Sequence, residues 1–286
     1  MSIKFLEPTG FPEASALLTE YGDDAKIIAG GTALVLMLRQ KLISPTVLVS
    51  LGRIPAQDFI RHETDGLHLG ALASLRAVES SSVVRSFCPA LAHAYAVVGN
   101  IRIRHQATLG GNLAEADYAS DPPSMLLALD ARVKVSGPGG LREIPIAEFF
   151  LGFYTTALEP GEIVTEVVLP PLSISARAAY LKFTSRSAED RPCVVVAVLA
   201  DFDPDGLCRD LRVAVGAAVE TPQRLAQVEA LAQGQKLDDE LIATMAADYA
   251  RTLDPLSDVR GSAWYRREMI GVFVRRALQE VRDVHR

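Results

Sequence analysis

Two glycine pairs stand where the sequence predicts strand-to-helix turns, and they are the residues best suited to hold a phosphorylated ligand. The first lies in Ile27–Leu34 (IIAGGTAL), after the apolar strand expected at Ala25–Ala29. Because glycine has no Cβ atom, a diphosphate can approach the backbone closely and accept hydrogen bonds from its N–H groups. Thr32 is expected to cap the following helix, and an ordinary capped turn is the alternative interpretation of this segment.

The second pair lies 80 residues further on, in Ala107–Asn112 (ATLGGN), and again combines a hydroxyl residue with two glycines. We expect a glycine turn here, leading through a polar loop to Asp121 at the start of a helix. Asp121 by itself could simply cap that helix. Two such loops could clasp one extended dinucleotide, so the pair is more informative than either motif alone.

Composition excludes several classes of function. The 286 residues are 49% hydrophobic, carry a net charge of -6 and contain no dense basic run, which argues against disorder and against nucleic acid as a partner. Cys88, Cys193 and Cys208 are too few and too scattered for an iron–sulfur cluster or a structural zinc site. Neither G-x-G-x-x-G nor G-x-x-x-x-G-K-[ST] occurs. Without a transmembrane segment or a signal peptide, the sequence predicts a soluble, cytoplasmic protein.

The order of the expected elements favours two domains of the α+β class. The first is expected to span residues 1–174, with subdomains of about 1–56 and 57–174, and its last strand is Ile163–Leu169. The second, residues 175–286, has strands first and helices after. Three strands are expected at Ala179–Thr184, Val194–Phe202 and Leu211–Val219, and three helices at Pro222–Ala232, Asp238–Thr252 and Ser262–Val284.

A series of motifs covers nearly the whole chain. It comprises A-G-G-[TS]-x-L at Ala29–Leu34 with Arg39 downstream, I-R-x-x-x-T-x-G-G-N at Ile103–Asn112, S-D-x-P with L-L-A-L-D-A within 120–131, P-G-E-I-V at 160–164 and Y-L-K-F at 180–183. In this order and spacing, the sequence resembles the medium, FAD-binding subunit of molybdenum hydroxylases of the carbon monoxide dehydrogenase and xanthine dehydrogenase type. The C-terminal third is similar to that family's flavoprotein C-terminal domain.

The resemblance implies an FAD-binding fold of the vanillyl-alcohol-oxidase (PCMH) type, with two α+β subdomains around the cofactor, and a small C-terminal α+β domain with a three-stranded sheet. It also implies where FAD binds. The diphosphate would be held by Ala29, Gly30, Gly31, Thr32 and Ala33, with Ile28 beside them, and by Thr108, Gly110, Gly111 and Asn112; Asp121 would lie by the flavin-bearing half, and Val164 and Lys182 near the adenine or isoalloxazine. For Lys182, a solvated strand lysine is the alternative.

Partner subunits are also implied by the resemblance. A small subunit with iron–sulfur clusters would deliver electrons, and a large molybdopterin subunit would hydroxylate the substrate, in a dimer of heterotrimers. FAD would pass the electrons to an external acceptor, for which a quinone, NAD and oxygen all stay open. This chain then needs no catalytic residue and no metal. The alternatives are a self-sufficient FAD-dependent oxidoreductase of the same fold and a non-catalytic assembly module without FAD.

Some residues near the motifs depart from the family pattern or have two interpretations. His105 stands where relatives usually have Asn, and we expect a hydrogen-bonded loop histidine rather than a covalent link to the flavin. Phe149 and Phe150 are expected in the core. Phe153 and Tyr154 could bring an aromatic ring near the isoalloxazine.

Overall fold

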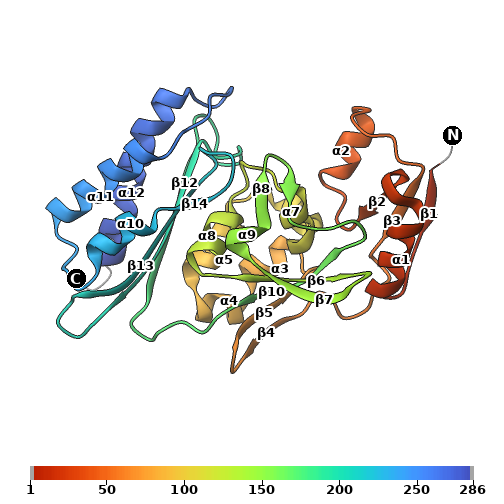
Figure 1. Ribbon diagram of the computed structural model, residues 1–286, viewed down its shortest axis with the longest axis horizontal. Helices are drawn as coiled ribbons and strands as arrows, with labels where there is room; N and C mark the ends of the chain where they lie inside the picture. The colour runs from red at the N-terminus through yellow and green to blue at the C-terminus, as the bar shows by residue number, and fades with distance from the viewer. Residues whose placement is uncertain (1–2, 284–286) are drawn as a thin grey trace.

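The structure is a computed structural model that describes residues 3–283, arranged as three blocks in a row (Figure 1). The first block holds a parallel three-stranded sheet in the order β1-β3-β2, with two connecting helices and a small core around Phe11 and Val49. Its elements are β1 (Lys4–Leu6), α1 (Phe11–Tyr21), β2 (Ala25–Ile28), α2 (Leu34–Arg39) and β3 (Val47–Ser50). The end residues 1–2 and 284–286 of the predicted domains lie outside the described residues.

The second block is built on an antiparallel five-stranded sheet in the order β4-β5-β10-β6-β7. Its strands are β4 (Ile60–Glu63), β5 (Gly66–Gly70), β6 (Arg132–Gly137), β7 (Gly140–Pro145) and β10 (Ile163–Leu169). Between β5 and β6 come α3 (Leu75–Ser80), α4 (Ser82–Phe87), α5 (Pro89–Ala96), α6 (Ile101–Gln106), α7 (Leu109–Glu115) and α8 (Pro122–Ala128). After β7 follow α9 (Ile146–Phe149) and the small hairpin β8 (Phe150–Gly152) and β9 (Thr155–Thr156).

The third block is an antiparallel sheet in the order β11-β12-β13-β14, with helices on its outer side (Figure 1). Its strands are β11 (Arg177–Phe183), β12 (Val194–Phe202), β13 (Cys208–Gly216) and β14 (Gln223–Arg224), and its helices are α10 (Ala226–Glu229), α11 (Asp239–Thr252) and α12 (Ala263–Asp283). Along β12, Val194 and Val196 pack in the core shared with these helices, whereas Val195 and Ala197 pack in the core of the second block. The sheet is therefore buried on both faces and joins the two blocks.

The sequence located most of these elements. Strands β10 and β12 begin and end at the predicted residues, and the α+β class is confirmed. The C-terminal sheet has four strands rather than three, because residues predicted as the start of a helix form β14, which pairs with β13. The helix predicted at Pro222–Ala232 is reduced to α10 and a 3₁₀ turn at Ala230–Ala232. The last predicted helix is α12, and its expected end, Val284, lies outside the described residues.

Candidate functional site

A cleft of about 760 Å³ lies where the first and second blocks meet, and the loop before β12 reaches its edge. It brings together both glycine segments, the loop before α8 and strand β10. All of the predicted site residues line it except Lys182: Ile28, Ala29, Gly30, Gly31, Thr32, Ala33, Thr108, Gly110, Gly111, Asn112, Asp121 and Val164. Residues separated by more than a hundred positions in the sequence thus share one surface.

The two glycine segments touch at Gly30. A Cβ atom at this position would lie 1.9 Å from the carbonyl oxygen of Gln106, so only glycine lets the first segment lie against the chain just before the second. Gly31 has a φ of +72°, in the left-handed region that glycine adopts without strain. Helix α2 begins at Leu34 with Ala33 as its N-cap and no capping side chain, so the prediction that Thr32 caps it is wrong.

The backbone of the first segment offers free hydrogen-bond donors. The N–H groups of residues 30–33 make no hydrogen bond to any part of the chain within 3–283. They are half-buried and lie on the cleft. Because nearly all buried backbone N–H groups are paired in folded proteins, a run of four such donors is suited to an acceptor-rich ligand such as a diphosphate.

The second segment is different, because its glycines lie inside a helix rather than in the predicted turn. Gly110 and Gly111 belong to the first turn of α7, whose N-cap Thr108 accepts a hydrogen bond at Oγ1 from the Gly111 N–H at 3.2 Å. The N–H of Asn112 donates to the Thr108 carbonyl at 2.9 Å, and that of Gly110 donates to the Ala71 carbonyl at 2.8 Å. A Cβ atom at Gly110 would lie 2.8 Å from the Cβ of Ala71, so this glycine allows close packing.

Asp121 is a buried carboxylate, and it does not cap α8. The Tyr180 hydroxyl donates to its Oδ1 at 2.8 Å, and the Lys182 ammonium donates to its Oδ2 at 3.1 Å. Lys182 also donates to the Val97 carbonyl at 2.7 Å and is buried, so the alternative of a solvated strand lysine is wrong. Burial raises the pKa of Asp121 to about 6, against the opposing effect of Lys182 and Tyr180.

Apolar side chains also line the cleft. Val164 on β10 and Leu158 come from the second block, and Leu36 and Met37 come from α2 in the first block. A cleft that combines polar donors with apolar side chains suits a dinucleotide, which has a charged diphosphate and two aromatic ring systems.

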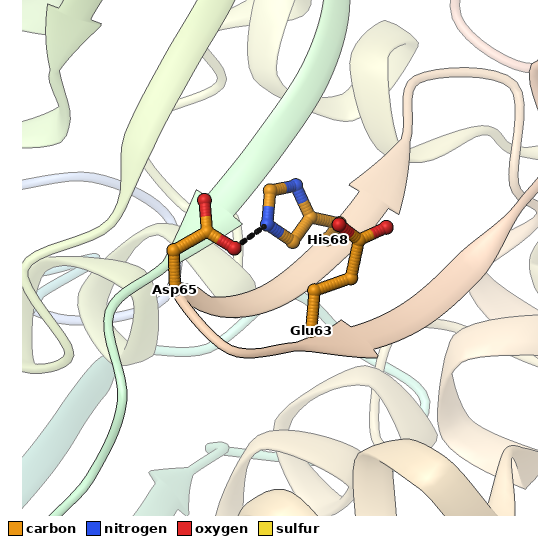
Figure 2. A group of neighbouring side chains, drawn as sticks. All are labelled: Glu63, Asp65 and His68. Carbon is orange, nitrogen blue, oxygen red and sulfur yellow. Dashed lines mark hydrogen bonds and ion pairs between the residues drawn. The ribbon is translucent and has the colours of Figure 1, made fainter.

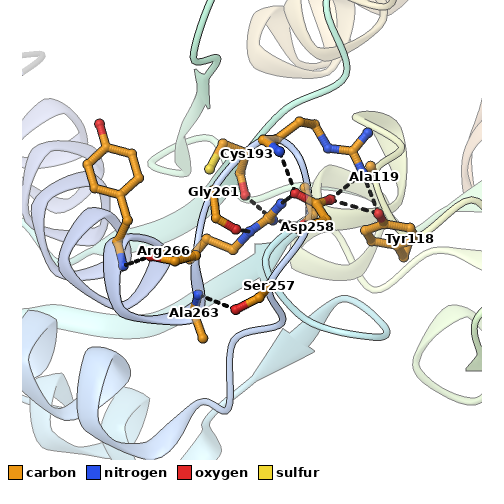
Figure 3. A network of polar contacts seen from close by, with 12 residues as sticks. Tyr118, Ala119, Cys193, Ser257, Asp258, Gly261, Ala263 and Arg266 are labelled. Atoms are coloured by element: carbon orange, nitrogen blue, oxygen red, sulfur yellow. Dashed lines mark hydrogen bonds and ion pairs between the residues drawn. The ribbon is translucent and has the colours of Figure 1, made fainter.

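The polar loop before α8 is fastened to the C-terminal domain by the network in Figure 3. Asp258 accepts hydrogen bonds from the Tyr118 hydroxyl at 2.8 Å, from Arg260 at 2.6 Å and from the fully buried Arg266 at 2.5 Å. Although burial opposes it, the bonds from Arg260, Tyr118 and Arg266 hold the pKa of Asp258 well below its ordinary value. No motif in the sequence points to this network, because Tyr118 lies 140 positions from Asp258 and 142 from Arg260.

Two further links hold the same loop. Arg191 forms an ion pair with Asp117 at 3.0 Å, and both residues line the cleft. The side chains of Asn112 and Ser120 exchange hydrogen bonds at 3.0 and 3.2 Å. The wall of the cleft near Asp121 is thus positioned from both α7 and the C-terminal domain.

The aromatic residues divide between the core and the surface. Phe149 is fully buried, as predicted, and contacts the partly buried Phe150 edge-on. Phe153 and Tyr154 are both half exposed, and Tyr154, which has a φ of +54°, lines the cleft whereas Phe153 does not. The Tyr118 ring contacts the rings of Phe153 and Tyr154 edge-on. His105 lies exposed on α6, and its side chain makes no hydrogen bond within residues 3–283, so the prediction of a hydrogen-bonded loop histidine is wrong.

A second cluster of possible ligand groups lies at the β4–β5 hairpin and comprises Glu63, Asp65 and His68 (Figure 2). Both ring nitrogens of His68 are already used, because Nε2 contacts Asp65 at 3.0 Å and Nδ1 contacts Glu166. Lys134 in turn pairs with Glu166 at 3.1 Å. These contacts explain the cluster as an ion-pair network that joins the strands of the second block.

Comparison with known proteins identifies the family. Residues 1–172 match the family model described as "FAD binding domain in molybdopterin dehydrogenase". The chain belongs to this family. Residues 179–281 match the CO dehydrogenase flavoprotein C-terminal domain, so both parts of this FAD subunit have the expected relatives.

Individual relatives of this FAD subunit are similar along nearly their whole length. The medium chain of glyceraldehyde dehydrogenase from Sulfolobus acidocaldarius is 32% identical over 262 residues, which is 92% of each chain. Subunit alpha of the 6-hydroxypseudooxynicotine dehydrogenase complex from Paenarthrobacter nicotinovorans is 34% identical, over 97% of this chain and 93% of that one. A solved structure of carbon monoxide dehydrogenase from Hydrogenophaga pseudoflava superposes with a TM-score of 0.94 at 31% identity, covering 98% and 97% of the two chains.

FAD is therefore the cofactor of this oxidoreductase subunit, and the fold is the predicted one. The cleft fits FAD, because four unpaired N–H donors and several apolar side chains line it. No helix within residues 3–283 is both long and apolar enough to cross a membrane.

Proposed function

We propose that this chain is the FAD-containing electron-transfer subunit of a heteromeric molybdenum hydroxylase. It takes electrons from iron–sulfur clusters of a small partner subunit and passes them to an external acceptor. The observation that carries the proposal is the cleft itself, with unpaired donors at residues 30–33 and the buried carboxylate of Asp121 on one surface. Bound FAD supplies the chemistry, since a flavin exchanges single electrons with iron–sulfur clusters.

The residues of this chain bind and orient the cofactor. The N–H groups of residues 30–33 donate hydrogen bonds to the diphosphate, and Thr32 adds a hydroxyl that has no partner among the described residues. Thr108, Gly110, Gly111 and Asn112 line the cleft beside this segment, and Gly110 lets α7 pack closely against Ala71.

Two further groups act near the rings of the cofactor. Asp121 accepts a hydrogen bond from a donor on the flavin-bearing half, and Lys182, at 3.1 Å, compensates its charge. Ile28, Ala29 and Val164 supply apolar contacts along the cleft. No residue of this chain needs to act as an acid, a base or a nucleophile, because the substrate is converted elsewhere in the complex.

The partners we propose are a small iron–sulfur subunit and a large molybdopterin subunit, in a dimer of heterotrimers. Support comes from relatives named as medium chains or as subunits of a dehydrogenase complex. The three cysteines of this chain are all buried and unpaired, so clusters must come from another chain. Free cysteines also favour a reducing compartment, and we place the protein in the cytoplasm.

We place the domain boundary at residues 174–175, with subdomains of about 1–56 and 57–174. The segment between β10 and β11 supports this division, since it connects two separate sheets. The matched family regions also end at residue 172 and begin again at residue 179.

The test is to recover the chain from its host with any co-purifying subunits, and to measure released flavin, iron and molybdenum against this polypeptide. We expect about one FAD per chain, a small subunit containing iron and a large one containing molybdenum. Substrate should bleach the flavin in the complex and leave the isolated chain unchanged. Flavin bleaching by an organic substrate in the isolated chain would instead establish a self-sufficient oxidoreductase, and a folded complex without flavin would refute both.

A further inference from the structure

Tyr180 does not line the cleft, yet its buried hydroxyl binds the carboxylate of Asp121, a residue that does. Tyr180 is 3% exposed and lies on the side of β11 that packs against the second block. Its hydroxyl lies 2.8 Å from Oδ1 of Asp121 and 3.3 Å from the carbonyl oxygen of the same residue. Because a hydroxyl has one proton to donate, the shorter contact to the charged oxygen is the dominant bond.

Two donors from one strand fix the orientation of this carboxylate. Tyr180 donates to Oδ1, and Lys182, two residues further along β11, donates to Oδ2. An ionised carboxylate can accept about four hydrogen bonds, so each oxygen retains acceptor capacity. Asp121 lines the cleft, and this remaining capacity is what it can offer to a ligand there.

The tyrosine is the more rigid of the two donors. Its ring packs edge-on against the ring of His93 on α5, with centroids 6.2 Å apart, so the position of the hydroxyl is set by packing. Lys182 has a long flexible side chain and divides its donors between Asp121 and the Val97 carbonyl.

We propose that Tyr180 is a positioning residue of the FAD site, whose hydroxyl keeps the Asp121 carboxylate ionised and turned to accept a hydrogen bond from the flavin-bearing half of FAD. The inference rests on the proposed function, because it assigns Asp121 to that half of the cofactor. Tyr180 does not line the cleft and acts only through Asp121.

The test compares Tyr180→Phe with Tyr249→Phe in the full-length chain, after removal and titration of FAD. Tyr249 is an equally buried tyrosine of the same domain whose hydroxyl donates to the Val213 carbonyl at 2.8 Å, away from the cleft. Loss of a hydrogen bond to a charged group predicts a Kd for FAD about tenfold higher in Tyr180→Phe. Tyr249→Phe should bind FAD as the unchanged chain does.

The pH profile of FAD binding separates positioning from a merely structural role. The ionised Asp121 carboxylate is a stronger acceptor than the protonated group, so FAD affinity should fall as the pH drops through about 6. Removing a hydrogen-bond donor to the ionised form raises the pKa of Asp121. Tyr180→Phe should therefore move the midpoint of the FAD-binding pH profile to higher pH. The titratable groups facing the pair are Lys182, Asp117 and His93, and in His93→Gln the midpoint should stay where it is.

Each outcome decides a different point. If Tyr180→Phe keeps both the affinity and the midpoint of the unchanged chain, Tyr180 is not a positioning residue, even though the FAD site stands. If Asp121→Asn binds FAD like the unchanged chain at every pH, the assignment of Asp121 itself fails. Should Tyr180→Phe not fold because it leaves the buried carboxylate short of a donor, the double variant Asp121→Asn/Tyr180→Phe replaces it: binding no weaker than in Asp121→Asn supports the proposal, and weaker binding than in Asp121→Asn overturns it.

Discussion

The two glycine segments share their letters but differ in the chemistry that their backbones can perform. In the first, the N–H groups of residues 30–33 have no partner within the described chain. In the second, those of Gly110, Gly111 and Asn112 are bound to Ala71 or Thr108. The first segment therefore offers FAD a run of four backbone donors, whereas the glycines of the second segment let a helix pack closely and have no free N–H group.

This difference between the two segments shows that a glycine pair can serve the packing of chain segments as well as the binding of a ligand. Gly30 meets the Gln106 carbonyl and Gly110 meets Ala71, so both glycines permit contacts between chain segments. What distinguishes the segments is whether their N–H groups have acceptors within the chain, and Thr108 and the remote Ala71 supply these to the second segment.

The largest expected effect follows from breaking the contact between the segments with Gly30→Ala. The added Cβ would lie 1.9 Å from the Gln106 carbonyl oxygen, so the backbone must move and the two walls must separate. We expect FAD binding to weaken roughly a hundredfold, as a loss of about 3 kcal/mol implies. Isothermal titration with FAD measures it. Gly52→Ala is the control, because its Cβ has only an ordinary contact at 3.5 Å; equal losses in both variants would contradict the account.

A moderate effect, on stability instead of binding, is expected for Gly110→Ala. The Cβ would lie 2.8 Å from that of Ala71, and overpacking of this kind costs about 1–3 kcal/mol of unfolding free energy. Urea unfolding of the FAD-free chain measures this loss. FAD affinity should change far less than in Gly30→Ala. A variant with unchanged stability and abolished FAD binding would show that the second segment also binds directly through its backbone.

The smallest effects on stability and FAD affinity are expected for substitutions of Thr108 and Thr32, one in each glycine segment. Thr108→Val removes the N-cap of α7 and should cost about 1 kcal/mol of stability, with little change in FAD affinity. Thr32→Val removes a hydroxyl that caps no helix, so stability should hold while FAD binding weakens about tenfold at most. Thermal unfolding and FAD titration of both variants give the four values. The two segments would be equivalent if both variants behaved alike.

The fold could be predicted from the sequence where neighbouring residues alone determine a helix or strand. Val194–Phe202 is an apolar run with four valines, interrupted only by Asp201, and β12 occupies it without a shift because the strand is buried on both faces. The cleft lining was also predictable in large part, since the family motifs carry the residues on both walls.

Contacts between remote segments were beyond the sequence. The second glycine pair was expected as a turn, and it became a helix because Thr108 caps α7 while Ala71 accepts from Gly110. Lys182 reads as a strand lysine that could be solvated, and only the tertiary fold brings it to Asp121. The same is true of Asp258, whose partner Tyr118 comes from another block.

Amide hydrogen exchange of the full-length chain with and without FAD tests directly whether the N–H groups of residues 30–33 bind the diphosphate. We expect the amides of residues 30–33 to exchange fast without FAD and to become protected when it binds, since the diphosphate accepts their hydrogen bonds. The amides of residues 110–112 should be protected in both states. Protection gained at residues 110–112 with none at residues 30–33 would contradict the account.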